Sequence, residues 1–332
     1  MKLLVIGGTQ FVGRAFVEEA ARGGEEVTVF HRGASEPADF PDVDHVHGDR
    51  DGQFGRLQGR AWDVVLDTCA YFPRAVREVA ALADSFDGYA LISTLGVHPD
   101  DMPAGWNEET ATYQPPFPQT EDVTGESYGP LKVACEREAV RAFGGECLII
   151  RPGYIVGPHD PTDRFTYYVR RAATGGQMLA PGPPEAPFQV VDVRDLATFM
   201  LDRVRAGDSG VYGVVGPGVP IAMRDVLETA RDAAGADTTF TWASEAFLNG
   251  LGDEVYSWFP MWEPGSGAHT YNAGKAIAAG LRHRPFRDTV ADTLAWDADR
   301  GRPDFLRGLS AQKEVELLAA WHNAADSAKD DM

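Results

Sequence analysis

The sequence predicts an α/β protein built on a Rossmann-type, doubly wound parallel sheet, with a smaller C-terminal substrate-binding lobe. Three observations lead to this fold class. Short runs rich in Val, Ile and Leu alternate with amphipathic stretches through the first half of the chain, as strands and helices do in a parallel α/β sheet. Successive residues in these runs are apolar, so both faces of each strand would be apolar, as expected of strands covered by helices on both faces of the sheet. A glycine-rich turn follows the first run directly.

Six apolar runs are the expected strands of the sheet: Lys2–Ile6, Glu26–Phe30, Val43–His47, Trp62–Asp67, Tyr89–Ser93 and Cys147–Arg151. Three stretches with helical spacing lie between them: Phe11–Arg22, Arg74–Ser85 and Tyr128–Phe143. The segment Gly96–Glu126 is long, polar and without a regular period. Loops of that length in a compact domain usually cover a site.

The regular alternation ends after Pro152, where proline, glycine and aromatic residues become denser. Residues 1–152 are therefore expected to form the Rossmann domain, and residues 187–206 to return to it. Residues 153–332 are expected to form mainly the substrate-binding lobe and the C-terminal helices, including a helix over Ala311–Ala325.

Composition excludes several classes of function. The net charge of −20 repels phosphate backbones, so nucleic acid is not an expected partner. No run of 18 apolar residues occurs, so no membrane span is expected, and Lys2–Ile6 is expected as a strand rather than as part of a signal peptide. The three cysteines, Cys69, Cys135 and Cys147, have no metal-binding spacing and fit a reducing compartment, so a cytoplasmic location is expected.

The glycine-rich turn after the first expected strand predicts a dinucleotide site. Its sequence is Gly7-Gly8-Thr9-Gln10-Phe11-Val12-Gly13, and it opens the first expected helix. Glycines allow a pyrophosphate to approach the helix N-terminus, where amide groups and the helix dipole attract anions. Gln10 stands where a further glycine is often found. The expected cofactor contacts from this turn are Gly7, Thr9, Gln10, Phe11, Val12 and Gly13.

The end of the second expected strand bears on the choice between NAD and NADP. A carboxylate there usually binds the ribose of NAD, whereas the 2′-phosphate of NADP needs a cation. His31 and Arg32 occupy these positions, and no acidic residue follows until Glu36. NADP is therefore the preferred cofactor, with NAD as the alternative. Asp49, at the end of the third strand, is expected to bind the adenine amine.

Tyr128 and Lys132 are the expected acid–base pair. They lie four residues apart on an expected helix and so share one face. A neighbouring ammonium favours the phenolate and lowers the pKa of a tyrosine, which can then exchange a proton with a substrate oxygen. Ser93 and Thr94 end the fifth strand at the carboxyl edge of the sheet, where ligands of α/β proteins bind.

With these motifs in order, the chain resembles the extended or atypical short-chain dehydrogenase/reductase superfamily, in its NAD-dependent epimerase/dehydratase branch. The resemblance also extends to Arg151-Pro152-Gly153, Asp192–Asp195 and Asn272–Lys275. It implies catalytic roles for Thr94, Tyr128 and Lys132, and Tyr128 and Lys132 are also expected to contact the cofactor, with the lysine holding the nicotinamide ribose. It further implies that the remaining cofactor contacts come from Cys69, Ala70, Ser93 and Pro152, and that the protein is a homodimer.

Two departures from that family bear on the substrate. Members that act on nucleotide sugars usually hold the diphosphate with two arginines, but Phe188 and the segment Trp262–Gly265 occupy the matching places. Losing two charge-assisted contacts would cost a diphosphate substrate several kcal/mol. Aromatic residues are instead frequent in segments expected to line the cleft. The expected substrate contacts are Tyr71, Phe72, Thr94, Gly96, His98, Phe165 and Phe188.

No metal site is expected. His45 and His47 alternate along the third strand as two metal ligands could, but the sequence places no third ligand near them.

Three functions remain open. The first is an NAD(P)(H)-dependent reductase or dehydrogenase that acts on a carbonyl or alcohol of a small, natural-product-like molecule. The second is an NAD-dependent sugar-nucleotide epimerase or dehydratase, which regenerates its cofactor in each cycle. The third is a cofactor- or RNA-binding regulator without catalysis, since some relatives with a similar glycine turn associate with RNA.

Overall fold

The computed structural model describes residues 1–35, 37, 40–115, 120–218 and 220–330. The chain forms two compact units. Unit 1 comprises residues 1–155, 190–218 and 271–283, and unit 2 comprises residues 156–189, 219–270 and 284–332.

Unit 1 contains a parallel sheet with the order β11-β6-β5-β4-β1-β2-β3. Each neighbouring pair in that order is parallel. The chain runs outward from β1 to β3 on one side and from β4 to β11 on the other, so the topological switch point lies between β1 and β4. The strands are β1 (Lys2–Ile6), β2 (Glu26–His31), β3 (Asp44–His47), β4 (Trp62–Asp67), β5 (Phe86–Ile92), β6 (Leu148–Pro152) and β11 (Gly210–Val214).

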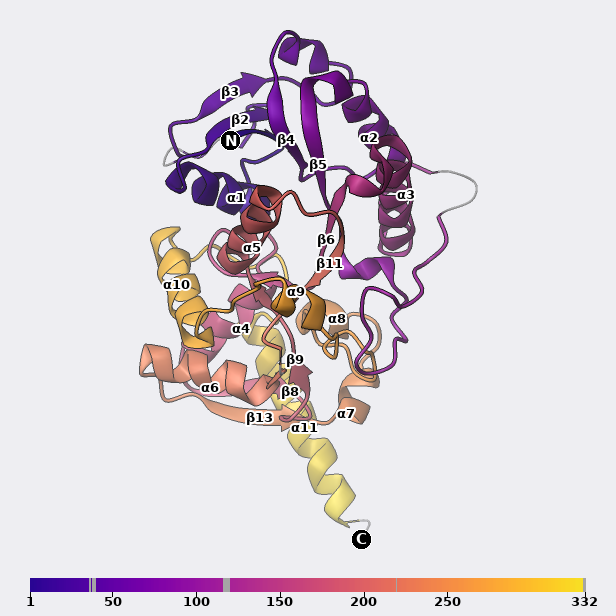
Figure 1. Cartoon of the computed structure of the whole chain (residues 1–332). Helices are drawn as coiled ribbons and strands as arrows, with labels where there is room; N and C mark the ends of the chain where they lie inside the picture. The colour runs from indigo at the N-terminus through magenta and orange to yellow at the C-terminus, as the bar shows by residue number, and fades with distance from the viewer. Residues whose placement is uncertain (36, 38–39, 116–119, 219, 331–332) are drawn as a thin grey trace. The chain divides into compact units, whose positions relative to one another are not determined.

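Helices cover both faces of this sheet (Figure 1). On one face, α1 (Phe11–Arg22) packs beside α5 (Val193–Arg205), and their apolar residues share a core with β1 and β2. On the other face, α2 (Pro73–Ala80) packs beside α3 (Gly125–Phe143), over a second core. The Rossmann-type doubly wound sheet predicted from the sequence is therefore confirmed.

Two elements of unit 1, helix α3 and strand β11, differ from the prediction made from the sequence. Helix α3 starts at Gly125 rather than Tyr128, because the Thr124 hydroxyl accepts a hydrogen bond from the Ser127 amide and caps the helix. Strand β11 pairs with β6 as a seventh strand. The short helix α9 (Gly274–Ala278) lies against β11, so residues 207–218 and 271–283 belong to unit 1, beyond the 187–206 segment expected to return there.

Unit 2 is built from helices around short strand pairs. Its strands β8 (Gln177–Pro181) and β13 (Thr239–Ala243) are parallel, and β9 (Pro187–Phe188) and β12 (Ile221–Ala222) are antiparallel. Two further short strands, β7 (Ile155–Val156) and β10 (Val191–Asp192), pair where the chain leaves and re-enters unit 1. The helices are α4 (Arg164–Ala172), α6 (Met223–Ala234), α7 (Glu245–Asn249), α8 (Val255–Trp258), α10 (Phe286–Asp299) and α11 (Ala311–Asp330).

In the part of the chain that the structure describes, no helix combines the length and the apolar composition needed to cross a membrane.

Candidate cofactor and active site

The glycine turn after β1 has the backbone that a phosphate-binding loop needs. Gly7 and Gly8 have φ values of +93° and +84°, in the region that glycine adopts readily. A Cβ atom on Gly13 would lie 2.6 Å from the Cα of Gly8. These residues therefore bring the start of α1 close to β1 and leave a backbone surface that a dinucleotide can approach, so the turn fits the expected cofactor.

The N-terminus of α1 is open to an anion. The Gln10 side chain is exposed and, within the described residues, makes no capping hydrogen bond to the helix. The first turn carries no acidic residue, and Phe11 starts the helix at φ +36°. Val12 packs into the core beneath the turn, and the Thr9 hydroxyl lies 3.0 Å from the Ser35 hydroxyl. The amides of the first turn can thus receive a phosphate group.

At the end of β2, the structure separates the two residues expected at the adenosine ribose. His31 is buried, and its Nδ1 accepts a hydrogen bond from the Gly33 amide at 3.1 Å. Arg32 is exposed. Asp49, expected at the adenine, accepts a hydrogen bond from the Asp51 amide and so shapes the loop after β3. Of these three residues, Arg32 is the cation that could reach a 2′-phosphate.

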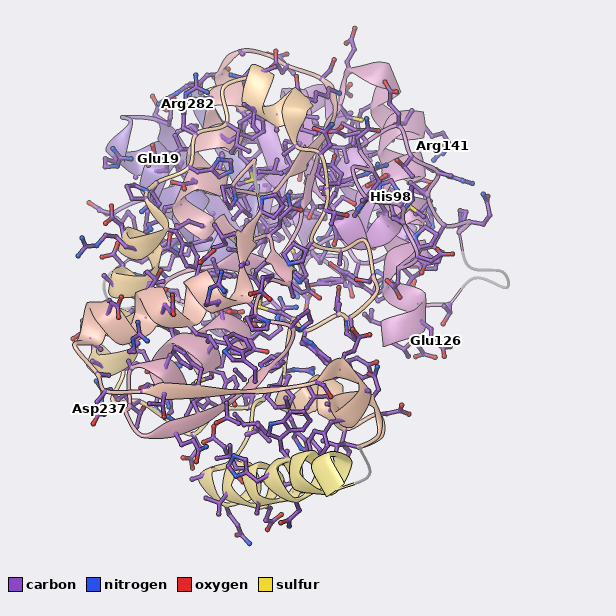
Figure 2. The ribbon with its side chains drawn as sticks, turned by 90° about the horizontal axis from the view of Figure 1, so that it is seen from below. Glu19, His98, Glu126, Arg141, Asp237 and Arg282 are labelled. Carbon is purple, nitrogen blue, oxygen red and sulfur yellow. The ribbon has the colours of Figure 1, made fainter. Side chains whose placement is uncertain are left out.

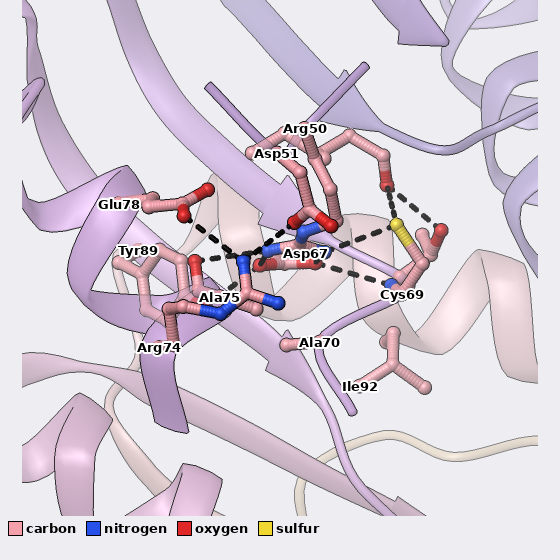
Figure 3. Close-up of polar contacts among 12 residues, drawn as sticks. Arg50, Asp51, Asp67, Cys69, Ala70, Arg74, Ala75, Glu78, Tyr89 and Ile92 are labelled. Carbon is pink, nitrogen blue, oxygen red and sulfur yellow. Dashed lines mark hydrogen bonds and ion pairs between the residues drawn. The ribbon is translucent and has the colours of Figure 1, made fainter. Parts of the chain in front are cut away.

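A buried ion pair between Arg50 and Asp67 fixes the end of β4 (Figure 3). Arg50 donates two hydrogen bonds of 2.9 Å to the two carboxylate oxygens of Asp67, which is fully buried. The hydroxyl of Tyr89 and the amide of Cys69 also donate to Asp67. Burial opposes the charge of Arg50, but the Asp67 carboxylate outweighs it and raises the pKa of the guanidinium.

The same guanidinium connects segments that the sequence treats as separate. Arg50 donates to the Cys69 sulfur at 3.1 Å and to the Ala75 carbonyl oxygen at 3.0 Å. A Cβ on Gly7 would contact the side chains of Thr68 and Cys69. Cys69 and Ala70 therefore lie directly beside the glycine turn. The roles of Arg50 and Asp67 were not predicted, because nothing in their spacing along the sequence links them.

Lys132 lies under the carboxyl ends of β4 and β5. It is 4% exposed, and its Nζ donates to the carbonyl oxygens of Ala70 at 2.9 Å and Ile92 at 2.6 Å. Burial lowers the pKa of this ammonium. Because an ammonium has three N–H donors, one remains to interact with a ligand or with a neighbouring side chain.

Thr94 and Tyr128 lie together at this edge. A Cβ on Gly96 would lie 3.4 Å from Oγ1 of Thr94 and 4.0 Å from Cε1 of Tyr128. The Tyr128 ring is half-buried, and its centroid is 6.4 Å from that of Tyr71. The Lys132 Nζ is 5.8 Å from the centroid of the same Tyr71 ring. The structure thus brings the three residues expected to be catalytic around one short segment and one aromatic ring.

A second buried network lies behind Thr94 and holds the side chains of Ser93 and His98. Ser93 donates to Glu136 at 2.5 Å, and Arg151 donates two hydrogen bonds to the Glu136 carboxylate. Arg151 also donates to Nε2 of His98 at 3.2 Å, and the other ring nitrogen of His98 contacts the Ala111 carbonyl oxygen. Burial lowers the pKa of His98. Ser93 and His98 are therefore buried inside the unit, and Figure 2 marks the position of His98.

The remaining expected contacts are divided between the two units. Pro152 ends β6, and Phe72 precedes α2, both in unit 1. Phe165 and Phe188 belong to unit 2 and are buried. Phe165 packs edge-on against Phe286. Phe188 stacks on His269, with ring centroids 5.1 Å apart.

Unit 2 contains a pocket of about 190 Å³. Its described lining includes two acidic residues, Glu245 and Glu263, and no lysine or arginine. His269 in its wall accepts a hydrogen bond from the Gln189 amide through Nδ1, and its Nε2 contacts the Met261 carbonyl oxygen. The remaining lining residues are mostly apolar: Gly182, Pro183, Ala186, Pro187, Phe188, Met223, Met261, Trp262, Pro264, Gly265 and Ser266.

Solved structures with the same fold are numerous. A putative epimerase from Burkholderia cenocepacia J2315 superposes with a TM-score of 0.68 at 19% identity, over 90% of this chain and 98% of that one. A UDP-glucose 4-epimerase gives 0.69 at 15% identity, over 93% and 100%. The enzyme WbmH from Bordetella bronchiseptica, in complex with NAD+, gives 0.67 at 16% identity, over 90% and 99%. The chain thus has the same fold as these two epimerases and as this enzyme solved with NAD+, which agrees with the fold that the resemblance implied.

Similarity in sequence is more limited. No protein-family model matches the chain. The chloroplast stem-loop binding protein of 41 kDa b from Arabidopsis thaliana is 27% identical over 217 residues, which are 60% of this chain. The match spans 54% of the length of that relative.

Proposed function

We propose that this protein is a nicotinamide-dinucleotide-dependent enzyme of the epimerase/dehydratase type, which oxidises and then reduces a carbon that bears a hydroxyl group. The named structural neighbours favour this function over net reduction, since one is a UDP-glucose 4-epimerase, one is a putative epimerase and a third was solved with NAD+. The observation that carries the proposal is the convergence of Thr94, Tyr128 and Lys132 at the carboxyl edge of the sheet in unit 1, which also carries the glycine turn.

The residues of this edge supply proton transfer. The bound nicotinamide would accept and return a hydride. The Tyr128 phenolate takes the proton of the substrate hydroxyl as the carbon is oxidised, and the phenol gives it back on reduction. The Lys132 ammonium favours the phenolate by its charge, and its bonds to Ala70 and Ile92 hold it in place. Thr94 orients the reacting oxygen through its hydroxyl.

The residues of the glycine turn and of the end of β2 would hold the dinucleotide. The α1 amides bind the pyrophosphate, and Cys69, Ala70 and Pro152 lie along the edge that the nicotinamide would reach. We propose NADP as the preferred form, because the exposed Arg32 follows β2 where NAD sites usually carry a carboxylate. NAD is the form present in the WbmH structure.

The substrate class that the chain supports best is a small, ring-containing molecule without a diphosphate. The pocket of unit 2 offers aromatic, proline and methionine side chains, and its charged lining residues are both acidic. A diphosphate would meet repulsion there instead of the arginine contacts that such groups use.

The test begins with the nucleotide content of the purified, tag-free protein. Tightly bound nicotinamide nucleotide, together with transient reduction and reoxidation on addition of a substrate, is the expected result. Absence of NAD and NADP binding in calorimetry would overturn the proposal. Steady consumption of added NADPH with ketones or aldehydes would instead establish the reductase. This second candidate stays open because the charged lining residues of the pocket in unit 2 are acidic, which disfavours the diphosphate of a nucleotide sugar.

RNA binding is a third candidate, because the name of the plant relative includes stem-loop binding. The net charge of −20 opposes it. Retention of a stem-loop RNA on filters at physiological salt, with release by NADP, would favour that function over catalysis.

A further inference from the structure

Three histidines from two strands meet at the β3 edge of the sheet. In the parallel register of β2 and β3, His31 is the partner of His47, and His45 precedes His47 by two residues. Side chains two residues apart on a strand point to the same face. The fold therefore supplies the third imidazole that the sequence alone did not place beside His45 and His47.

The three rings are close enough to act together. Nε2 of His31 lies 2.8 Å from Nδ1 of His45, and the His31 and His47 ring centroids are 4.8 Å apart. One ring nitrogen from each residue lies within 4.8 Å of the others. His31 is buried, His45 is half-buried and His47 is exposed, so the cluster has a closed base and one side open to solvent.

We propose that His31, His45 and His47 form a binding site for a divalent transition-metal ion such as Zn²⁺, Co²⁺ or Ni²⁺. Imidazole nitrogen is a preferred ligand of these ions, whereas Mg²⁺ and Ca²⁺ require oxygen ligands. Zn–N bonds of about 2.0–2.1 Å place two tetrahedral ligands about 3.4 Å apart. Ring nitrogens that are 4.8 Å apart therefore have to approach by about 1.4 Å, whereas Nε2 of His31 and Nδ1 of His45, at 2.8 Å, have to separate by about 0.6 Å. Water can complete the coordination on the open side.

Metal binding replaces two hydrogen bonds of His31, one to His45 and one from the Gly33 amide, by coordination. The Gly33 amide donates to Nδ1 of His31, so the ring proton of neutral His31 is on Nε2 and points at His45. For Nε2 to bind a metal, that proton must move to Nδ1 and the Gly33 amide must turn away. Gly33 is exposed and has a φ of +77°, and the freedom of glycine permits such a turn.

The surroundings support a site rather than a solvated cluster. The Phe40 ring lies 5.6 Å from the ring of His45, and Phe40 itself packs on the core under α1. An apolar backing strengthens the coordination of an ion. A bound ion would also join β3 to β2 at the sheet edge, in addition to the ladder of main-chain hydrogen bonds. The proposal is independent of the proposed enzymatic function.

The experiment uses the tag-free full chain after treatment with EDTA. Calorimetric titration with ZnCl₂ should show one ion per chain, and CoCl₂ should give the visible absorption of Co²⁺ bound to nitrogen ligands. Loss of a residue that only hydrogen-bonds to a metal ligand commonly weakens metal affinity about 10–100-fold. His47→Ala removes a ligand itself, so it should weaken Zn²⁺ binding by more than about tenfold. Saturating Zn²⁺ should also raise the melting temperature of the wild type more than that of the variant.

A matched control is His322→Ala, which removes an exposed imidazole on α11. It should bind Zn²⁺ as the wild type does. The proposal is overturned if the wild type binds no ion, if His47→Ala binds as tightly as the wild type, or if His322→Ala weakens binding equally. Far-ultraviolet circular dichroism of both metal-free variants establishes that they are folded, and His45→Gln provides a second removal of a ligand.

Discussion

The glycine turn of unit 1 (Gly7–Gly13) and the pocket of unit 2 offer opposite kinds of surface to a ligand. In the glycine turn, main-chain groups dominate: two glycines with positive φ and the uncapped start of α1 provide amides for an anion. In the pocket, side chains dominate, and the charged ones are both acidic. The same chain thus offers one surface suited to phosphate and another that disfavours it.

This difference separates what the two units contribute to specificity. An anionic cofactor can be bound through backbone geometry, which few side-chain substitutions remove. Under the proposed function, the choice of substrate in unit 2 would depend on aromatic area and on the sign of two charges, which single substitutions change. Substitutions in the two units, taken in order of decreasing effect, test this difference.

Tyr128→Phe should reduce turnover by about 10²–10⁴-fold, because it removes the proton-transferring hydroxyl. Affinity for NADP should stay within a few-fold of the wild type, since the main-chain groups of the glycine turn are unchanged. Rates and calorimetric cofactor titrations measure the two effects. Tyr212→Phe is the control, because that hydroxyl contacts Asp208 instead. Full activity in Tyr128→Phe would remove the proposed role of the phenol.

Asp67→Asn should lower the free energy of unfolding by about 3–5 kcal/mol, because it leaves the buried Arg50 charge without its carboxylate. Urea unfolding measures the loss. The double variant Asp67→Leu with Arg50→Met should lose less than Asp67→Asn alone, since neither charge remains buried. Equal losses in the single and double variants would show that the unpaired Arg50 charge is not the cause of the destabilisation.

Gly13→Ala should lower the free energy of unfolding by about 1–3 kcal/mol through overpacking, because the new Cβ would lie 2.6 Å from Gly8. It should also weaken NADP binding, as the turn and α1 move apart. Gly55→Ala is the matched control, since its Cβ would have no neighbour within 4 Å. Unchanged NADP affinity in Gly13→Ala would show that cofactor binding does not depend on the close approach of Gly13 to Gly8.

Lys132 gives a pH dependence with a defined sign. Burial lowers its pKa in the folded protein below the unfolded value. Between these two pKa values the unfolded chain binds more protons, so the free energy of unfolding rises with pH. Relative to Lys132→Met, the wild type should therefore gain stability from neutral to alkaline pH. Urea unfolding of both proteins across that range measures the gain, and parallel pH profiles would contradict it.

Glu263→Gln should have the smallest effect. Removing one partly exposed charge from the pocket changes binding by up to about 1 kcal/mol, and should favour UDP-glucose as a competing ligand by a few-fold. Ser266→Ala, in the same wall, is a control that leaves the charge unchanged. A larger gain for Ser266→Ala than for Glu263→Gln would show that charge does not set the selectivity of this pocket.

Much of unit 1 was predictable, because its central strands are buried on both faces and so appear as continuous apolar runs. The turn at Gly7–Gly13 and the helix Phe11–Arg22 were also predictable from local signals. Strand β11 was not, since two glycines in Gly210–Val214 weaken a strand pattern. The start of α3 depends on the Thr124 cap, which its sequence neighbours did not indicate.

The site was predictable only where a motif carried it. Tyr128 and Lys132 lie one helical turn apart, so their spacing is informative. Glu136, which holds Ser93 and Arg151, acts through contacts distant in sequence. The meeting of His31 with His45 and His47 depends on the register of two strands. Pairings of this kind follow from the assembled sheet and not from local spacing.

The reach of Arg50 has a consequence for redesign of the cofactor preference. Its guanidinium holds Asp67 at the end of β4, the sulfur of Cys69 and the start of α2 through Ala75. Asp49, the neighbouring residue, was the one expected at the adenine. A loop transplanted from a dehydrogenase to alter adenine recognition would therefore also disturb the end of β4 and the start of α2, unless the graft retained an arginine at position 50.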